Sequence, residues 1–284
     1  MRKKRTHIYL LSPLLLYFAL FFFVPMVVLF VYSFWTKTTT DLVPTFTLRN
    51  YANIFSRALY PRIIWYSLRI GLVTAGICVL ASYPVAYALT FKYKRLQDFA
   101  LYLILISLFS SYLVRVYAWK TILGTNGLIN QILISLRLID QPVTFLLYSP
   151  TSVIITLVFI LIPFTVLPIF SSLQNINLDL LEAARDLGAN SAQTFFRVIL
   201  PLSMPGIVSG FTFSFILAAG DYVTPQMVGG TSGLMIGRIV ADQFGMIYDW
   251  PFGSALSYST ILLLILVVAL INWALRATKL RRDF

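Results

Sequence analysis

Charged side chains are scarce in this sequence, and their scarcity excludes an ordinary soluble domain. Only 11% of the residues are charged and 59% are hydrophobic, with a mean hydropathy of +0.84, whereas soluble domains carry roughly 25% charged and 45–50% apolar residues. The net charge of +12 does not indicate nucleic-acid binding, because the lysines and arginines stand in short clusters between apolar blocks. Such blocks predict an all-α membrane protein.

Reactive side chains are also few, which excludes several chemistries. The single cysteine, Cys78, permits no disulfide within the chain and no cysteine-based metal cluster, and its apolar surroundings suit a small hydrophobic residue. The single histidine, His7, lies in the basic N-terminal flank, where we expect a solvated interfacial position rather than a proton relay. With no convergent set of catalytic groups, we expect no catalytic residues, no metal site and no membrane enzyme.

Two further absences concern energy coupling. The sequence contains no Gly-Lys dipeptide, so the phosphate-binding loop G-x-x-x-x-G-K-[ST] is missing and we expect nucleotide to bind elsewhere. An ion-driven secondary transporter, the first alternative for a membrane protein of this size, usually shows internal repeats and coupling acids embedded in the membrane. We find neither in the sequence.

The apolar blocks are long enough to be transmembrane helices, because about 20 residues cross a hydrocarbon core of about 30 Å. The first block exceeds the roughly 7–15 residues of a secretory h-region and no A-x-A pattern follows it, so we expect it to be retained. We predict one transmembrane domain, residues 1–284, with six helices: Ile8–Phe34, Tyr66–Phe91, Phe99–Leu123, Thr151–Leu173, Val198–Thr224 and Ser254–Leu275.

Basic residues predict the orientation of these helices. An even number of helices places both termini on the same side of the membrane, and positive residues concentrate on the cytoplasmic side. The loops on the opposite side are longer and carry fewer basic residues, so both termini are predicted to be cytoplasmic. The basic clusters on the predicted cytoplasmic side are Arg2 to Arg5, Lys92 to Arg95, Arg185 with Arg197, and Arg276 to Arg282.

The cytoplasmic segment 175–201, between the fourth and fifth predicted helices, has the chemistry of a short surface helix. Asn177 is a good N-cap, Asp179 falls in the positive first turn, and Gly188 suits a left-handed stop. Ser191 can cap a second helix that leads back into the membrane. The spacing of three and four residues predicts one apolar face made of Leu180, Leu181, Ala184 and Leu187.

A short rod fastened at both ends to membrane helices is suited to transmitting movement rather than to catalysis. Glu182, the only glutamate of the chain, lies in the middle of this rod. Ala183 and Ala184 keep the rod thin beside it, so the groove of a partner protein can close around the helix.

The residues Glu182-Ala183-Ala184, then Gly188, then Val198-Ile199-Leu200-Pro201 resemble the E-A-A-x3-G-x9-I-x-L-P loop of binding-protein-dependent ABC importer permeases. The only departure is Val198, where the family usually has isoleucine. The resemblance covers nearly the whole chain and is strongest to the spermidine/putrescine group. It implies the ABC importer permease (MetI-like) fold and assigns the coupling role to Glu182, Ala183, Ala184, Asp186 and Gly188.

The resemblance also implies the partners and the place of the chain. A cytoplasmic ATPase dimer would bind the Glu182 helix and hold ATP and magnesium, a second permease would pair with this one, and an extracytoplasmic binding protein would deliver the substrate. The chain itself would need no cofactor and would lie in the bacterial inner membrane as a multi-pass protein. Relatives of this group also carry other small organic solutes, so polyamines and such solutes both stay open as cargo.

A cationic cargo would need carboxylates or ring faces along its path. Asp221 is the best candidate for a cation contact, because a carboxylate at membrane depth usually faces a cavity. Its alternatives are a place at a helix end, or an ion pair with Arg115 or Lys120, two side chains that we expect to extend to the headgroups. The other pathway candidates are Tyr222, Tyr117, Trp119 and Asp242, and the aromatic residues among them suit an interfacial belt equally well.

Overall fold

The computed structural model describes residues 13–14, 16–38 and 41–277, and it is almost entirely helical in that part of the chain. The basic N-terminal flank with His7, the predicted start of the first helix at Ile8, and residues 278–284 lie outside the described residues. The chain forms two compact units, which are Met1–Arg62 with Ile239–Leu263, and Ile63–Arg238 with Leu264–Phe284.

The first unit begins with the apolar helical stretch Leu16–Tyr32, made of η1 (Ala19–Phe23) and α2 (Val24–Tyr32), and continues into a small antiparallel ladder of β1 (Thr36–Lys37) and β2 (Leu42–Val43). Helix α3 (Arg49–Ser56) then follows. Its buried Asn50 donates hydrogen bonds to the carbonyl oxygens of Ser33 and Trp35 at 3.0 and 2.8 Å, which pairs backbone groups freed where α2 ends.

The same unit contains the end of α12 (Ile236–Gly245) and the first part of α13 (Trp250–Ala277). Asp249 caps α13, because its Oδ1 accepts a hydrogen bond of 3.1 Å from the backbone N–H of Phe252. Tyr258 of α13 donates a hydrogen bond to the carbonyl of Met26, and its ring lies edge-on to Phe30 at 5.1 Å. Helix α13 therefore packs on α2.

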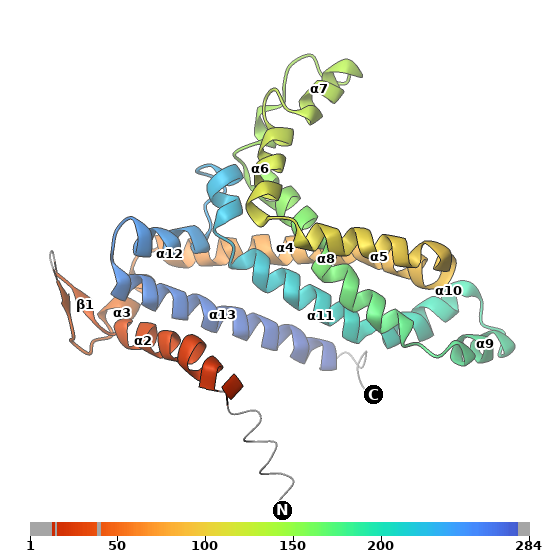
Figure 1. Cartoon of the computed structure of the whole chain (residues 1–284), viewed down its shortest axis with the longest axis horizontal. Helices are drawn as coiled ribbons and strands as arrows, with labels where there is room; N and C mark the ends of the chain where they lie inside the picture. The colour runs from red at the N-terminus through yellow and green to blue at the C-terminus, as the bar shows by residue number, and fades with distance from the viewer. Residues whose placement is uncertain (1–12, 15, 39–40, 278–284) are drawn as a thin grey trace, which may run out of the picture. The chain divides into compact units, whose positions relative to one another are not determined.

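The second unit holds most of the long helices (Figure 1). Helix α8 begins at a capping box of Ser149 and Ser152. The elements in chain order are α4 (Leu59–Tyr87, mostly in this unit), η2 (Ala88–Lys92), α5 (Lys94–Phe109), α6 (Tyr112–Leu123), α7 (Leu128–Ser135), η3 (Thr144–Leu146), α8 (Pro150–Gln174), α9 (Leu178–Asp186), α10 (Ser191–Thr194), η4 (Phe195–Ile199), α11 (Leu200–Ala219) and η5 (Pro225–Gly229).

Four stretches are long and apolar enough to span a membrane: Leu59–Lys92, Pro150–Gln174, Ser191–Ala219 and Trp250–Ala274. They correspond to the second, fourth, fifth and sixth predicted helices. The prediction of a continuous third helix over Phe99–Leu123 is wrong, because the chain bends by 96° at Ser110 and Ser111, between α5 and the stretch Tyr112–Ser135 that begins with α6. Serine hydroxyls compete with helical hydrogen bonding, which favours a break at this pair. The count of six spans stays a prediction.

Helices α8 and α11 run side by side (Figure 1), and their backbones approach closely at two glycines. A Cβ atom added at Gly206 of α11 would lie 2.5 Å from the carbonyl oxygen of Pro168, and one at Gly210 would lie 3.0 Å from that of Thr165. The hydroxyls of Thr165 and Ser214 are hydrogen-bonded across the same interface. Small residues four apart allow this close approach, which is a common way to pack helices in membranes.

Candidate functional site

Helix α9 in segment 175–201 is closed at its N-terminus as the sequence predicts. The side chain of Asn177 accepts a hydrogen bond of 3.0 Å from the backbone N–H of Asp179, and its amide donates to the Asp179 carboxylate at 3.1 Å. Asp179 also places a negative charge in the first turn, where the helix dipole is positive. The start of the helix is therefore fixed by residues within the segment itself.

The C-terminus of α9 ends on Gly188, which has a φ of +81°. The N–H of Ala189 donates to the carbonyl of Ala184 at 3.0 Å, and the N–H of Gly188 donates to that of Arg185 at 2.8 Å. These two bonds make a Schellman motif, which requires a left-handed residue at the position of Gly188. The predicted left-handed stop is confirmed.

One side chain anchors α9 to the helices around it. Leu181 is 7% exposed and belongs to a buried apolar cluster that unites the ends of three long helices. Its partners in that cluster include Leu173 of α8, Ile176 just beyond it, Ile199 of η4 and Leu89 of η2. A displacement of α9 would therefore carry the ends of α8 and α11 with it.

The remaining surface of α9 is open, and the predicted single apolar face is wrong in part. Leu181 and Ala184 point inward, but Leu180 is 49% exposed and Leu187 is 89% exposed. At 100° per residue, Leu180, Ala183 and Leu187 make one outward apolar strip. Beside it runs an exposed acidic strip of Asp179, Glu182 and Asp186. Leu181 alone can anchor α9, because the ends of the neighbouring helices enclose its side chain.

The chain returns toward the membrane through α10, whose cap lies one residue earlier than predicted. Asn190, not Ser191, is the N-cap, and it forms a capping box with Gln193 through two hydrogen bonds of 2.9 Å. An amide side chain reaches the N3 position and is among the best caps, so Asn190 takes that role. The following η4 is a π-helix, and the ring of its Phe195 lies 5.8 Å from both Tyr83 and Tyr87.

Asp221 lies at the opposite end of α11, directly after Gly220, the residue that caps that helix. Its Oδ2 accepts hydrogen bonds from the Tyr112 hydroxyl at 2.8 Å and the Thr224 N–H at 3.1 Å, and its Oδ1 accepts from the Val223 N–H at 3.2 Å. The Tyr112 hydroxyl also lies 2.9 Å from that of Thr224. Sequence reasoning identified Asp221 but missed Tyr112, whose partner is far along the chain.

The structure pairs neither Arg115 nor Lys120 with Asp221 within the described residues. The Arg115 guanidinium lies 6.0 Å from the Tyr112 ring centroid, and Nη1 donates a long 3.5 Å hydrogen bond to the carbonyl of Ile160. Its Nε is buried without a partner among the described residues, and the extension of Arg115 to the headgroups stays a prediction. The ammonium of Lys120 lies 6.0 Å from the Tyr117 ring centroid.

The other predicted pathway residues are dispersed. Tyr117 lies on an exposed apolar face of α6 with Leu113 and Val114, whereas Trp119 packs edge-on against Phe159 at 5.2 Å. Tyr222 is exposed and follows Asp221 directly in the sequence, which none of the other predicted aromatic residues does. Asp242 is half-buried near the end of α12 and belongs to the unit that contains Ile239–Leu263.

Metal binding has no candidate site in the part of the chain that the structure describes. No three histidine, cysteine, aspartate or glutamate side chains there lie close enough together to hold a metal ion. The acidic side chains of α9 and the carboxylate of Asp221 differ in their surroundings. The α9 acids Asp179, Glu182 and Asp186 are exposed, whereas Asp221 accepts hydrogen bonds from its own neighbourhood.

Comparison with known proteins gives a family and several relatives. Residues 8–282 match the family described as binding-protein-dependent transport system inner membrane component. The chain is 38% identical to the spermidine/putrescine transport system permease protein PotB of Salmonella typhimurium over 262 residues, covering 92% of this chain and 90% of the relative. It is 31% identical to the inner membrane ABC transporter permease protein YdcU of Escherichia coli, covering 93% and 87%.

Solved structures agree on the fold. A bacterial alginate ABC transporter, in complex with a periplasmic protein bound to an alginate pentasaccharide, contains a chain that matches with a TM-score of 0.71 and 17% identity, covering 98% of this chain and 96% of that one. The MetNI methionine ABC transporter in an inward-facing conformation matches with a TM-score of 0.53 and 20% identity, covering 75% and 91%. The family match over residues 8–282 and the identity to permease proteins over 92% of the chain lead to one conclusion: this chain belongs to the inner membrane components of binding-protein-dependent transport systems.

Proposed function

We propose that this chain is the permease subunit of an ATP-driven importer that moves polyamines, spermidine or putrescine, across the inner membrane into the cytoplasm. The observation that carries the proposal is α9, a short helix capped at both ends, open to solvent along Glu182, and anchored by Leu181 to the ends of the long helices. The relatives named for spermidine/putrescine transport support the cargo.

The proposed machine requires partners on both sides of the membrane. A cytoplasmic ATPase dimer, which holds ATP and magnesium, binds α9 in a groove with an apolar floor and a basic rim that match its two exposed strips. A second permease pairs with this chain, and an extracytoplasmic binding protein delivers the cargo. In this arrangement the chain has six spans and both termini in the cytoplasm.

The movement follows from how the helices are packed. Gly206 and Gly210 bring α8 and α11 so close that the pair moves as one body with α9. ATP-driven closure of the ATPase dimer then shifts α9 and, with it, both helices between inward-open and outward-open states. The coupling energy is the difference in ATPase affinity between those two states. Glu182, Ala183, Ala184, Asp186 and Gly188 are the proposed contact residues.

The proposed cation contact is Asp221. Its carboxylate accepts three hydrogen bonds, and Tyr222 beside it offers an exposed ring face. An ammonium group of a polyamine would find both a negative charge and a ring at this end of α11. Trp119, Tyr117 and Asp242 are proposed as lesser contributors along the path.

Reconstitution tests the proposal. The chain is assembled with an ATPase, a sister permease and a binding protein of the same transporter family, and uptake of labelled spermidine and putrescine into vesicles is measured with ATP inside or outside. We expect ATP-dependent uptake that Glu182→Lys lowers at least about tenfold while the chain stays inserted. Uptake driven by an ion gradient without ATP would refute the mechanism, and ATP-dependent uptake of a different small organic solute would correct only the cargo.

A further inference from the structure

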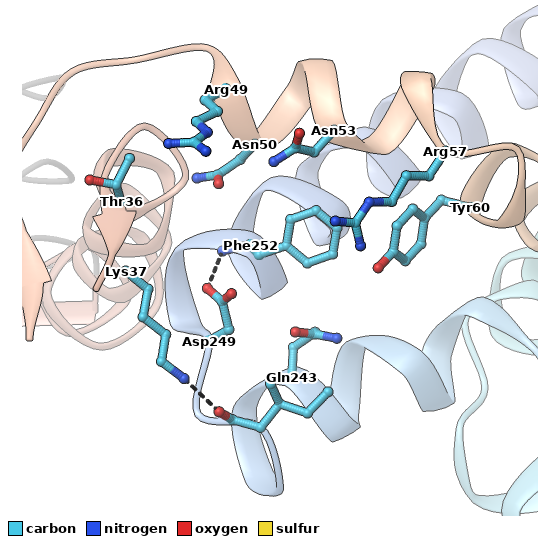
Figure 2. A pocket seen from close by; sticks show the side chains of 11 residues that line it. Thr36, Lys37, Arg49, Asn50, Asn53, Arg57, Tyr60, Gln243, Asp249 and Phe252 are labelled. Carbon is cyan, nitrogen blue, oxygen red and sulfur yellow. Dashed lines mark hydrogen bonds between the residues drawn. The ribbon is translucent and has the colours of Figure 1, made fainter. Parts of the chain in front are cut away.

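A polar cavity of about 390 Å³ opens in the first unit, between α3 and the turn that joins α12 to α13 (Figure 2). Cationic side chains dominate its wall, since Lys37, Arg49 and Arg57 stand against the single carboxylate of Asp249. Asn53 and Gln243 add amide groups. Arg49 and Asn53 are spaced four residues apart on one face of α3, and Arg57 follows as the residue that caps the helix.

Some of these polar groups are already satisfied. The Lys37 ammonium donates a hydrogen bond of 2.7 Å to the carbonyl of Ile247, and Asp249 caps α13 (Figure 2). The guanidinium groups of Arg49 and Arg57 differ, because neither has a carboxylate or hydrogen-bond partner among the residues that the structure describes. Two guanidinium groups with ten N–H donors between them therefore line the cavity without a direct ion-pair or hydrogen-bond partner in the described chain.

The cavity lies at the level where membrane-spanning helices begin. Its wall includes Tyr60, in the first turn of the span Leu59–Lys92, and Phe252, in the first turn of the span Trp250–Ala274. Their rings pack edge-on at 5.1 Å. The 34 residues of Leu59–Lys92 exceed the roughly 20 that cross a hydrocarbon core, so the first turn of that helix extends toward the headgroup region, where aromatic side chains concentrate and lipid phosphates are located.

The residues around the cavity also suit contact with acyl chains. Phe46, Leu48 and Leu59 are exposed beside α3, and Phe55 on α3 itself is 65% exposed. A helix with exposed apolar side chains on one side and arginines on another is typical of segments that lie in the plane of the interface. A ligand with an anionic head and apolar tails would match both kinds of surface at once.

We propose that this cavity is a binding site for the phosphate of an anionic phospholipid, held by Arg49 and Arg57. Guanidinium groups bind phosphate oxygens in a bidentate way, and they do so more strongly where the surrounding wall reduces access of water. Asn53 and Gln243 lie where they can bond hydroxyl groups of a glycerol headgroup. The excess positive charge favours phosphatidylglycerol over zwitterionic phosphatidylcholine.

The test is a lipid titration of the full-length purified chain followed by native mass spectrometry. Dioleoylphosphatidylglycerol, dioleoylphosphatidylcholine and inorganic phosphate are added separately to the wild type and to Arg49→Gln/Arg57→Gln. We expect the double variant to bind phosphatidylglycerol at least about tenfold more weakly, since a single charge-assisted contact is already worth about that factor and the variant removes two. Binding of phosphatidylcholine is expected to be weak in both proteins, and inorganic phosphate alone is expected to bind less tightly than the lipid.

The matched control is Arg62→Gln/Arg137→Gln, which removes two exposed arginines that do not line the cavity. Both double variants change the net charge equally, so a general attraction to anionic lipid would fall equally in both. An equal loss, or no loss in either variant, would overturn the proposal. A variant that keeps its lipid but loses affinity for the secreted binding protein would also overturn it and would assign the cavity to an acidic protein side chain. Unchanged melting temperatures establish that the variants fold.

Discussion

The hydroxyl of Tyr112 donates a 2.8 Å hydrogen bond to Oδ2 of Asp221, and this bond joins the start of α6 to the segment that follows α11. Tyr112→Phe removes only the bonding hydroxyl. We expect the free energy of unfolding to fall by about 1 kcal/mol, because Oδ2 then keeps a single donor. Thermal denaturation of the purified chain measures the change. Tyr117→Phe is the control, since its hydroxyl has no hydrogen-bond partner among the described residues, and an equal loss in both variants would contradict the importance of this bond.

Asp221→Asn tests the charge at the same place with little change of shape. Asparagine caps turns as well as aspartate does, so we expect the local fold and the assembly of the transporter to persist. Uptake of a polyamine should fall about tenfold or more at low concentration, with a higher KM, because the cation loses its counter-charge. Initial uptake rates over a range of concentrations give the answer. Unchanged kinetics would leave Asp221 as a structural cap.

Two leucines of α9 distinguish anchoring from partner contact. Leu181→Ala empties a buried site and should lower the free energy of unfolding by about 2–4 kcal/mol, whereas Leu187→Ala changes an exposed side chain and should stay within about 0.5 kcal/mol. Hydrogen exchange of the α9 amides should accelerate only in Leu181→Ala. If Leu187→Ala proved the more destabilising of the two, Leu181 would not be the anchor.

Gly188 offers a test of backbone strain free of side-chain clashes. A Cβ at this position meets no atom within 4 Å, yet the φ of +81° disfavours ordinary L residues. Gly188→Ala should therefore lower the free energy of unfolding by about 1 kcal/mol, and Gly188→Asn by less, because asparagine tolerates the left-handed region. Thermal melts of the two variants should rank in that order. The reverse order would show that something other than backbone conformation selects glycine.

The close packing of α8 and α11 predicts a strong effect at Gly206. Gly206→Leu would force atoms into the backbone of α8, so we expect a loss of more than about 3 kcal/mol or a failure to insert stably. Gly76→Leu is the matched control, because a Cβ there meets nothing within 4 Å in the described structure. Folding yield and melting temperature in detergent compare the two. A tolerated leucine at position 206 would mean that the two helices can separate.

Local chemistry made part of the site predictable. The ends of α9 depend on Asn177, Asp179 and Gly188, which act on backbone groups within a few residues, and the sequence therefore predicts them correctly. The partner of Asp221 could not be found in this way, because Tyr112 lies 109 residues away and nothing in the sequence brings them together.

The third predicted span failed for a different reason. Hydropathy averages over Phe99–Leu123 and passes over the adjacent serines at 110 and 111, although a pair of serines within an apolar block is a recognisable signal for a kink. The cavity near Arg49 and Arg57 could not be predicted from the sequence either. Its walls come from segments near both ends of the sequence, and spacing along the chain cannot predict such a meeting.

The corner between α5 and α6 restricts its own surroundings. Around it the last carbonyls of one helix and the first amides of the next lack helical partners, and Phe109 beside them is 89% exposed. Hydrocarbon offers nothing to bond such groups, so acyl chains cannot enclose this elbow. Where the elbow lies at membrane depth, water in a channel or the wall of a neighbouring subunit therefore borders it. Residues 109–111 then mark a part of the assembled transporter that is hydrated or contacts another subunit.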